Sequence, residues 1–167
     1  MVLSKPELVS SLQNEVRILI HLAGKIDRSK LDYRPTPKQR STIELLRYMC
    51  VMGPTLVQAA KNGAFDPAVW TANAKRVEEL GLDEIVATLA SHAEQYASLL
   101  ADVSDADLRG SVDMFGTTSS RGSFLVNSVL CGCAAYRMQL FLYLKACGRE
   151  ELSTMNLWAG VDAPPPA

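Results

Sequence analysis

The longest apolar stretch of the chain covers residues 123–148 and reads SFLVNSVLCGCAAYRMQLFLYLKACG. A stretch of this length and composition is either a buried helix or a membrane span. Arg137 would lie near mid-depth in any membrane placement, which is costly without a partner, so we interpret the stretch as the central helix of a soluble helical domain. Its middle carries small residues where a core helix usually carries Leu or Ile. This pattern predicts that a neighbouring helix or a ligand approaches the backbone closely there.

Two capping boxes mark the starts of the first two predicted helices. Ser4 and Ser41 each precede a glutamate by three residues, which is the S-x-x-E spacing of a helix N-terminus. Apolar residues at helical spacing extend the first helix over about residues 5–23 and the second over about residues 42–62. Pro54 removes one hydrogen bond inside the second helix.

The remaining pattern predicts two further long helices and long connections between them. A helix over about residues 82–101 and the helix of residues 123–148 complete a set of four amphipathic segments. Long connections separate helices two and three and helices three and four, so we predict an all-α four-helix bundle that is not a simple up-down-up-down set. The smaller predicted features are a short helix over about residues 71–80, a brief extended piece or hairpin within residues 104–121, and an irregular tail over residues 150–167 in which Trp158 packs back on the bundle. All of residues 1–167 form one predicted domain.

Charge and cysteine usage exclude several classes of protein. Lys and Arg number 17 and Asp and Glu 18, spread along the chain, so nothing indicates a nucleic-acid-binding surface. The four cysteines lie in apolar helical context, which predicts buried thiols of a reducing compartment rather than a disulfide framework. The N-terminal sequence alternates polar and apolar residues and contains Glu7 and Glu15, unlike a signal or transit peptide. We therefore predict a cytoplasmic protein with neither a nucleic-acid nor a membrane partner.

Five motifs follow one another along nearly the whole chain. They are Y-R-P-T-P, S-T-I-E-L-L-R-Y-M, S-D-A-D-L, Y-R-M-Q-L-F-L-Y-L-K-A-C-G and N-L-W-A-G. In this order and spacing they resemble the DinB-like family of bacterial four-helix bundles. The resemblance implies four helices around a polar pocket and a homodimer. It also implies a divalent metal, usually held by three histidines, and in some members a thiol-dependent transferase or isomerase activity.

The three ligand positions of that family correspond here to Tyr48, Gly132 and Tyr136. Glycine has no side chain to offer, and a neutral tyrosine with a pKa near ~10 is a poor ligand for zinc or nickel. We therefore predict no metal and no other cofactor, and a small-molecule pocket lined by Tyr48, Gly132 and Tyr136 with Ser128 and Arg137. Three interpretations stay open: the two rings fill the vacated volume, they line a ligand cavity, or one tyrosine acts as an acid or base.

The other candidate groups have structural interpretations beside the functional ones. Arg137 in a core helix is usually paired, and Glu15 or Glu44 lies within reach. His21 is expected near the end of the first helix, partly exposed and favoured by the helix dipole. His92 is expected at the surface or at its boundary.

The preferred hypothesis is a DinB-like protein that binds a small molecule without metal, or that lacks catalysis. The alternative is a divergent thiol-dependent transferase or metal-dependent hydrolase. Such an enzyme would need a re-sited zinc or nickel centre that uses His21, His92 or a cysteine.

Overall fold

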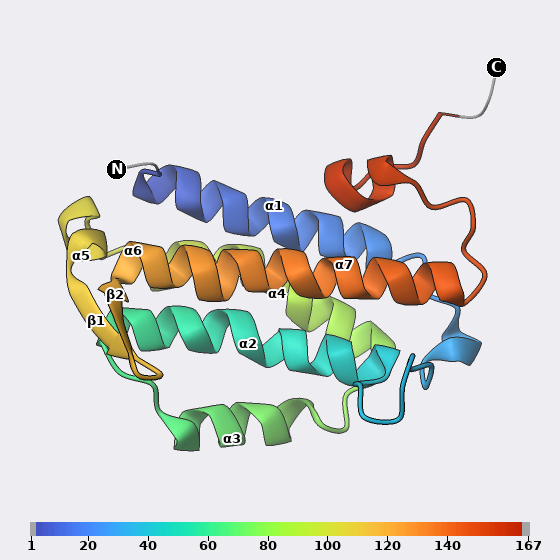
Figure 1. The fold of residues 1–167 in the computed structure, drawn as a ribbon, viewed down its shortest axis with the longest axis horizontal. Helices are drawn as coiled ribbons and strands as arrows, with labels where there is room; N and C mark the ends of the chain where they lie inside the picture. Colours follow the sequence, from blue (N-terminus) through green and yellow to red (C-terminus); the bar gives the residue numbers. More distant parts are fainter. Residues whose placement is uncertain (1–2, 165–167) are drawn as a thin grey trace.

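Four long helices form the body of the molecule. The computed structural model describes residues 3–164, and within them α1 packs against α4 and α7, and α2 packs against the same two helices (Figure 1). α1 and α7 run in one direction, and α2 and α4 run in the other. The predicted all-α bundle is therefore confirmed, as is its departure from up-down-up-down order. The bounds of the four helices are α1 Lys5–Ala23, α2 Thr42–Asn62, α4 Leu82–Leu99 and α7 Cys131–Ala146.

Smaller elements fill the long connections. α3 lies along the outer side of α2, where it links α2 to the parallel helix α4 (Figure 1). An antiparallel hairpin with Ser111 opposite Ser120 confirms the predicted extended piece. The bounds are 3-10 turn Arg28–Lys30, α3 Pro67–Val77, α5 Asp105–Arg109, β1 Ser111–Met114, β2 Thr117–Ser120 and α6 Arg121–Phe124, with π-helical stretches at Leu125–Leu130 and Met155–Ala159.

The helix ends follow the local sequence signals. Both predicted capping boxes are present, and Gly63 ends α2 with a φ of 77°. The short helix predicted over residues 71–80 begins earlier, at Pro67, because the Asp66 carboxylate accepts hydrogen bonds from the first free amides of α3. α6, Leu125–Leu130 and α7 continue as one helix, which we call the last helix, Arg121–Ala146.

The core of the bundle holds a histidine that the sequence placed at the surface. His92 is only 3% exposed, so that expectation is wrong. One turn further along α4, the hydroxyl of the buried Tyr96 occupies the space that a Cβ atom at Gly53 would fill. The ring of His92 lies beside the backbone carbonyl of Cys50, and this polar contact raises the pKa of His92 against the larger effect of burial. Two polar side chains of α4, His92 and Tyr96, therefore pack against the middle of α2.

The cysteines and the tail depart partly from expectation. Cys50 and Cys133 are buried as predicted, but Cys131 is exposed and Cys147 is half-buried, because the last helix presents one face to the surface. In the tail it is Leu157 that packs into the bundle, whereas the side chain of Trp158 is 65% exposed. Residues 165–167 of the predicted irregular tail lie outside the described residues.

Among the described residues, the last helix is long and apolar enough by length and composition to cross a membrane. Core helices of water-soluble proteins meet the same criteria. In this fold the helix lies against α1 and α2, and its Arg137 forms an ion pair with Glu15 of α1.

Candidate functional site

Tyr48 of α2 and Tyr136 of α7 lie in contact, where the resemblance placed two of the three ligand positions. Their ring centroids are 5.0 Å apart with the planes inclined at 67°, an edge-to-face arrangement. Both side chains are half-buried. The two rings therefore pack against each other between α2 and α7. Tyr48 also lines a separate groove on the side of α2 that faces α3.

The other three residues expected in the pocket do not line the groove beside Tyr48. Gly132 faces Met52, whose terminal methyl would be 3.3 Å from a Cβ atom added at Gly132. Arg137 is 3% exposed and turns toward α1, where it pairs with Glu15, and it does not line the groove beside Tyr48. Ser128 is half-buried in the π-helical stretch and is likewise outside that groove.

A groove of about 710 Å³ separates α2 from α3, and we call it the Tyr48 groove. The sequence pattern predicts a short helix in this region but not its packing side by side with α2, which depends on tertiary contacts. Trp70 of α3 was the available signal, since a tryptophan in a short amphipathic helix needs a packing partner. The side chains that define the groove are Arg40, Arg47, Tyr48, Trp70, Lys75 and Glu78.

Aromatic rings form one wall of the Tyr48 groove. The rings of Tyr48 and Trp70 have centroids 5.8 Å apart and are inclined at 60°. The guanidinium of Arg40 lies over the Tyr48 ring at 3.9 Å from its centroid, within range of a cation–π interaction. A planar cation and two aromatic side chains thus meet at one end of the groove.

Cations outnumber free carboxylates along the groove. Among residues 3–164, neither Arg40 nor Lys75 forms an ion pair with a carboxylate. Arg47 donates twice to the carbonyl of Leu80, at 3.2 and 2.9 Å, which fixes the turn after α3 to α2. Glu44 is held by the Ser41 amide and by Arg34, and these contacts keep its pKa below the usual range.

The Tyr48 phenol is a hydrogen-bond donor rather than a base. Burial raises the pKa of Tyr48 to about 12, and the neighbouring Tyr136 hydroxyl adds to the shift. The phenol is therefore neutral near pH 7. A neutral phenol donates one hydrogen bond and supplies an apolar ring face.

The residues at the three positions that the motif resemblance assigns to metal ligands do not fit a zinc or nickel site. Zinc and nickel prefer imidazole and thiolate donors, and here two tyrosines and a glycine stand in their places. Met52 occupies the space in front of Gly132 with a thioether, which is a soft ligand suited to Cu(I) rather than to zinc. Across the described part of the chain, no three His, Cys, Asp or Glu side chains are grouped closely enough to hold a metal ion.

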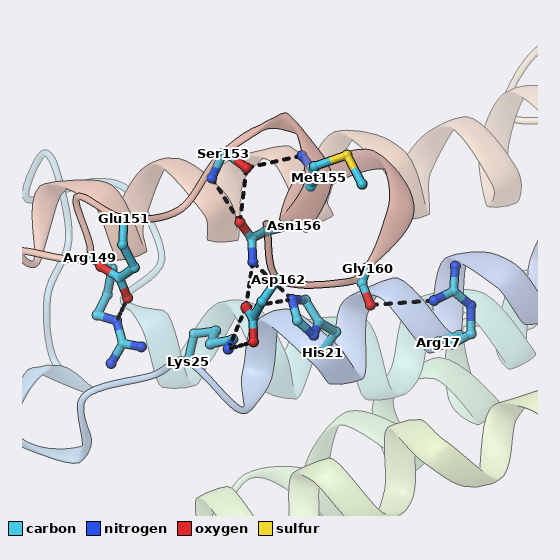
Figure 2. Close-up of polar contacts among 10 residues, drawn as sticks. All are labelled: Arg17, His21, Lys25, Arg149, Glu151, Ser153, Met155, Asn156, Gly160 and Asp162. Atoms are coloured by element: carbon cyan, nitrogen blue, oxygen red, sulfur yellow. Dashed lines mark hydrogen bonds and ion pairs between the residues drawn. The ribbon is translucent and has the colours of Figure 1, made fainter. Parts of the chain in front are cut away.

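His21 belongs to a second polar cluster, at the far end of α1 (Figure 2). The amide nitrogen of Asn156 lies 3.1 Å from Nε2 of His21 and donates to Asp162 at 2.9 Å. Lys25 pairs with the same carboxylate at 2.7 Å. Burial lowers the pKa of His21, while Asp162 opposes the shift. The cluster joins the tail to α1, and His21 is one of its members rather than part of the Tyr48 groove.

Comparisons with known proteins address the fold. No protein-family model matches this sequence, and no curated protein does. Among solved structures, the chain is similar to a DinB-like protein (YjoA) from Bacillus subtilis, with a TM-score of 0.67. The fold is DinB-like. The match covers 87% of this chain and 94% of that one, so the DinB-like fold includes almost the whole molecule and confirms the resemblance seen in the motifs. Sequence identity is 19%, at which the likeness establishes the DinB-like fold alone.

Proposed function

We propose that this DinB-like protein binds a small planar anion in the Tyr48 groove without the help of a metal. The observation that carries the proposal is the Arg40 guanidinium, which lies 3.9 Å over Tyr48 beside Trp70 and has no carboxylate partner among residues 3–164. Arginine next to an aromatic wall suits a ligand that combines a ring with a carboxylate. An aromatic carboxylate is the simplest ligand of this class.

The charge balance supports an anion over a cation. Glu44 already accepts from the Ser41 amide and pairs with Arg34 at 3.2 Å, so its charge is largely compensated. Arg40 and Lys75 then face a single unpaired carboxylate, Glu78, along the groove. A negatively charged ligand would complete the pairing that these two cations lack.

The aromatic wall supports a planar ligand. Trp70 and Tyr48 are half-buried, so their outer edges and faces remain open to the groove. A ring placed against them would exchange water for aromatic contact, and the neutral Tyr48 phenol could donate to it. A tyrosine with a pKa of about 12 would be a weak acid–base catalyst near pH 7, so binding fits this site better than proton transfer.

A re-sited thiol or metal centre has less support. Burial raises the pKa of Cys50 and of Cys133 to about 12, which disfavours the reactive thiolate. His92 is engaged with the backbone of α2, and His21 is engaged with Asn156 of the tail. The two histidines therefore have structural partners, and the pKa values of the two buried cysteines disfavour a reactive thiolate at either of them.

The test uses 2-naphthoate and its uncharged counterpart 2-naphthamide as probes. We expect naphthoate to shift the NMR signals of Tyr48, Trp70 and their neighbours, and to bind about tenfold more tightly than naphthamide, as one charge-assisted hydrogen bond predicts. Arg40→Gln should remove this preference, whereas Lys30→Gln, an exposed lysine away from the groove, should leave it unchanged. Equal affinity for both probes, or an unchanged preference in Arg40→Gln, would refute the proposal.

A further inference from the structure

The exposed positions of the last helix carry no charge. Seven of its residues are exposed, and none is Asp, Glu, Lys or Arg. The exposed positions of the other long helices include charges, such as Glu7 and Arg17 in α1 and Asp83 and Glu94 in α4. The seven residues, which we call the neutral stripe, are Ser123, Asn127, Cys131, Ala135, Met138, Leu142 and Ala146.

The neutral stripe has the spacing of a helix-packing seam. Its members follow one another at intervals of four, four, four, three, four and four residues, which keeps them on one face of a helix. Two of them are large apolar side chains with substantial exposure, Met138 at 38% and Leu142 at 56%. The most apolar stretch of 18 residues in this helix has the composition of a core helix, yet only 28% of its residues are buried. Such a face is expected to be covered.

Small and large residues are arranged along the stripe so that it complements itself when reversed. Cys131 and Ala135 are small, and Met138 and Leu142 are large. If two copies cross antiparallel with a two-fold axis between Ala135 and Met138, Cys131 meets Leu142 of the partner subunit. Ala135 then meets Met138 of the partner subunit, so each large side chain faces a small one. In the same register, Asn127 meets Ala146 of the partner subunit at each end of the contact.

We propose that the neutral stripe is an isologous interface at which a second copy of this chain packs its last helix antiparallel. A two-fold interface places the same patch on both subunits, so a charged patch would repel itself and a neutral one does not. The proposal goes beyond the homodimer implied by the family resemblance, because it specifies the face, the direction and the residue pairs. It is independent of the Tyr48 groove, which is formed by α2 and α3.

The surface beside the stripe adds to the contact. A groove of about 500 Å³ lies between α7 and the loop that contains Tyr33, Pro35 and Gln39, and Met138 and Leu142 line it as well. The last helix is ~39 Å long and ~10 Å wide, so the stripe alone would bury ~800 Å² over both copies. Specific dimers usually bury ~1,200–2,000 Å², and the loop beside the stripe supplies further surface.

The first test measures the oligomeric state. Sedimentation equilibrium of the full chain should show a monomer–dimer equilibrium at micromolar concentration. Ala135→Glu places two carboxylates near the two-fold axis and should weaken the dimer at least tenfold. Ala90→Glu, at an exposed position of α4, is the matched control and should leave it unchanged. Since both positions are exposed, both variants should fold, which circular dichroism checks. A monomer at all concentrations, or equal effects of the two substitutions, would overturn the proposal.

The second test measures direction by disulfide trapping in a Cys147→Ser background. In the antiparallel register, Leu142→Cys places a thiol opposite Cys131 of the partner subunit, so copper phenanthroline should yield a covalent dimer. The two native Cys131 residues would lie ~16 Å apart, which is beyond disulfide reach, so the parent should stay uncrosslinked. Adding Cys131→Ser to Leu142→Cys should abolish the crosslink. A dimer crosslinked through Cys131 alone would indicate parallel helices and overturn the proposal. If the protein is instead a monomer that binds phosphatidylcholine vesicles, the neutral stripe is a lipid-binding surface, and this result would also overturn the proposal.

Discussion

The ring of His92 lies beside the carbonyl of α2 that Pro54 leaves without its helical donor. Pro54 has no N–H, so the carbonyl of Cys50, four residues earlier, lacks its helical donor. His92 approaches that carbonyl from α4, and this polar contact raises the pKa of the buried ring against the larger effect of desolvation. The proline and the buried histidine are thus two parts of one structural arrangement.

The first prediction concerns this pair. His92→Leu should lower the free energy of unfolding by ~1–3 kcal/mol, because it removes the polar ring that lies beside the Cys50 carbonyl and could replace its missing helical donor. In a Pro54→Ala background the restored amide bonds to that carbonyl, so the same substitution should cost clearly less. Urea unfolding of the four proteins of the double-mutant cycle measures the coupling. Equal losses in the two backgrounds would show that His92 does not replace the proline's missing donor.

The second prediction is a pH dependence. Burial lowers the pKa of His92 from 6.5 to about 4, so between these values the unfolded chain binds the proton that the folded chain excludes. Stability should therefore fall as the pH drops from 6.5 to 4, by at most about 3 kcal/mol from this group, and should not change further below that range. Urea unfolding at pH 7, 5.5 and 4 should show a shallower decline in His92→Leu than in the wild-type protein. Parallel curves would contradict the prediction.

The sequence predicts the helices well because their signals are local. The capping boxes at Ser4 and Ser41 and the glycine at Gly63 each act within one or two turns, and the structure has all three. The position of His92 depends on the register of α4 against α2, which no local pattern encodes. Pro54 indicated that a donor was missing, but not which residue would replace it.

The candidate site was predictable only in part for the same reason. The motif resemblance placed Tyr48 and Tyr136 on the wall of one pocket, and their rings are in contact. The groove beside them depends on α3, whose Trp70 packs across from Tyr48. Arg137 was assigned both to the pocket and to an ion pair with Glu15, and the structure has the ion pair.

The third prediction concerns two helical glycines, the buried Gly53 and the half-buried Gly132. Gly53→Ala should destabilise the fold by ~2–3 kcal/mol, because its Cβ would meet the hydroxyl of the buried Tyr96. In a Tyr96→Phe background the cost should be smaller, since the hydroxyl is gone. Gly132→Ala should cost less than Gly53→Ala, because its Cβ would meet only the flexible end of Met52. Thermal unfolding compares the variants, and an equal cost at the two glycines would contradict the packing described.

Gly132→Leu extends the comparison at the same place on the last helix. Its larger side chain has limited space against Met52 and should destabilise by ~1–3 kcal/mol. An unchanged melting temperature would show that Met52 yields without cost.

The fourth prediction concerns the buried ion pair that joins α1 to the last helix. Arg137 donates from two nitrogens to the Glu15 carboxylate, at 2.7 and 3.1 Å, and a third nitrogen donates to the carbonyl of Leu157. The two side chains are 4% and 12% exposed, so removing the carboxylate leaves a guanidinium buried without a counter-charge. Glu15→Gln should therefore cost ~3–5 kcal/mol in urea unfolding.

An exposed pair on the same molecule provides the control. Arg28 and Asp83 form a similar ion pair with side chains 65% and 78% exposed, so Asp83→Asn should cost less than ~1 kcal/mol. Combining Glu15→Leu with Arg137→Met should cost less than the sum of the single substitutions, because no unpaired charge then remains buried. If Glu15→Gln and Asp83→Asn cost the same, the Arg137–Glu15 pair is not desolvated as the structure describes. If Glu15→Gln costs several kcal/mol but the effects of Glu15→Leu and Arg137→Met simply add, the loss of stability comes from packing rather than from an unpaired charge.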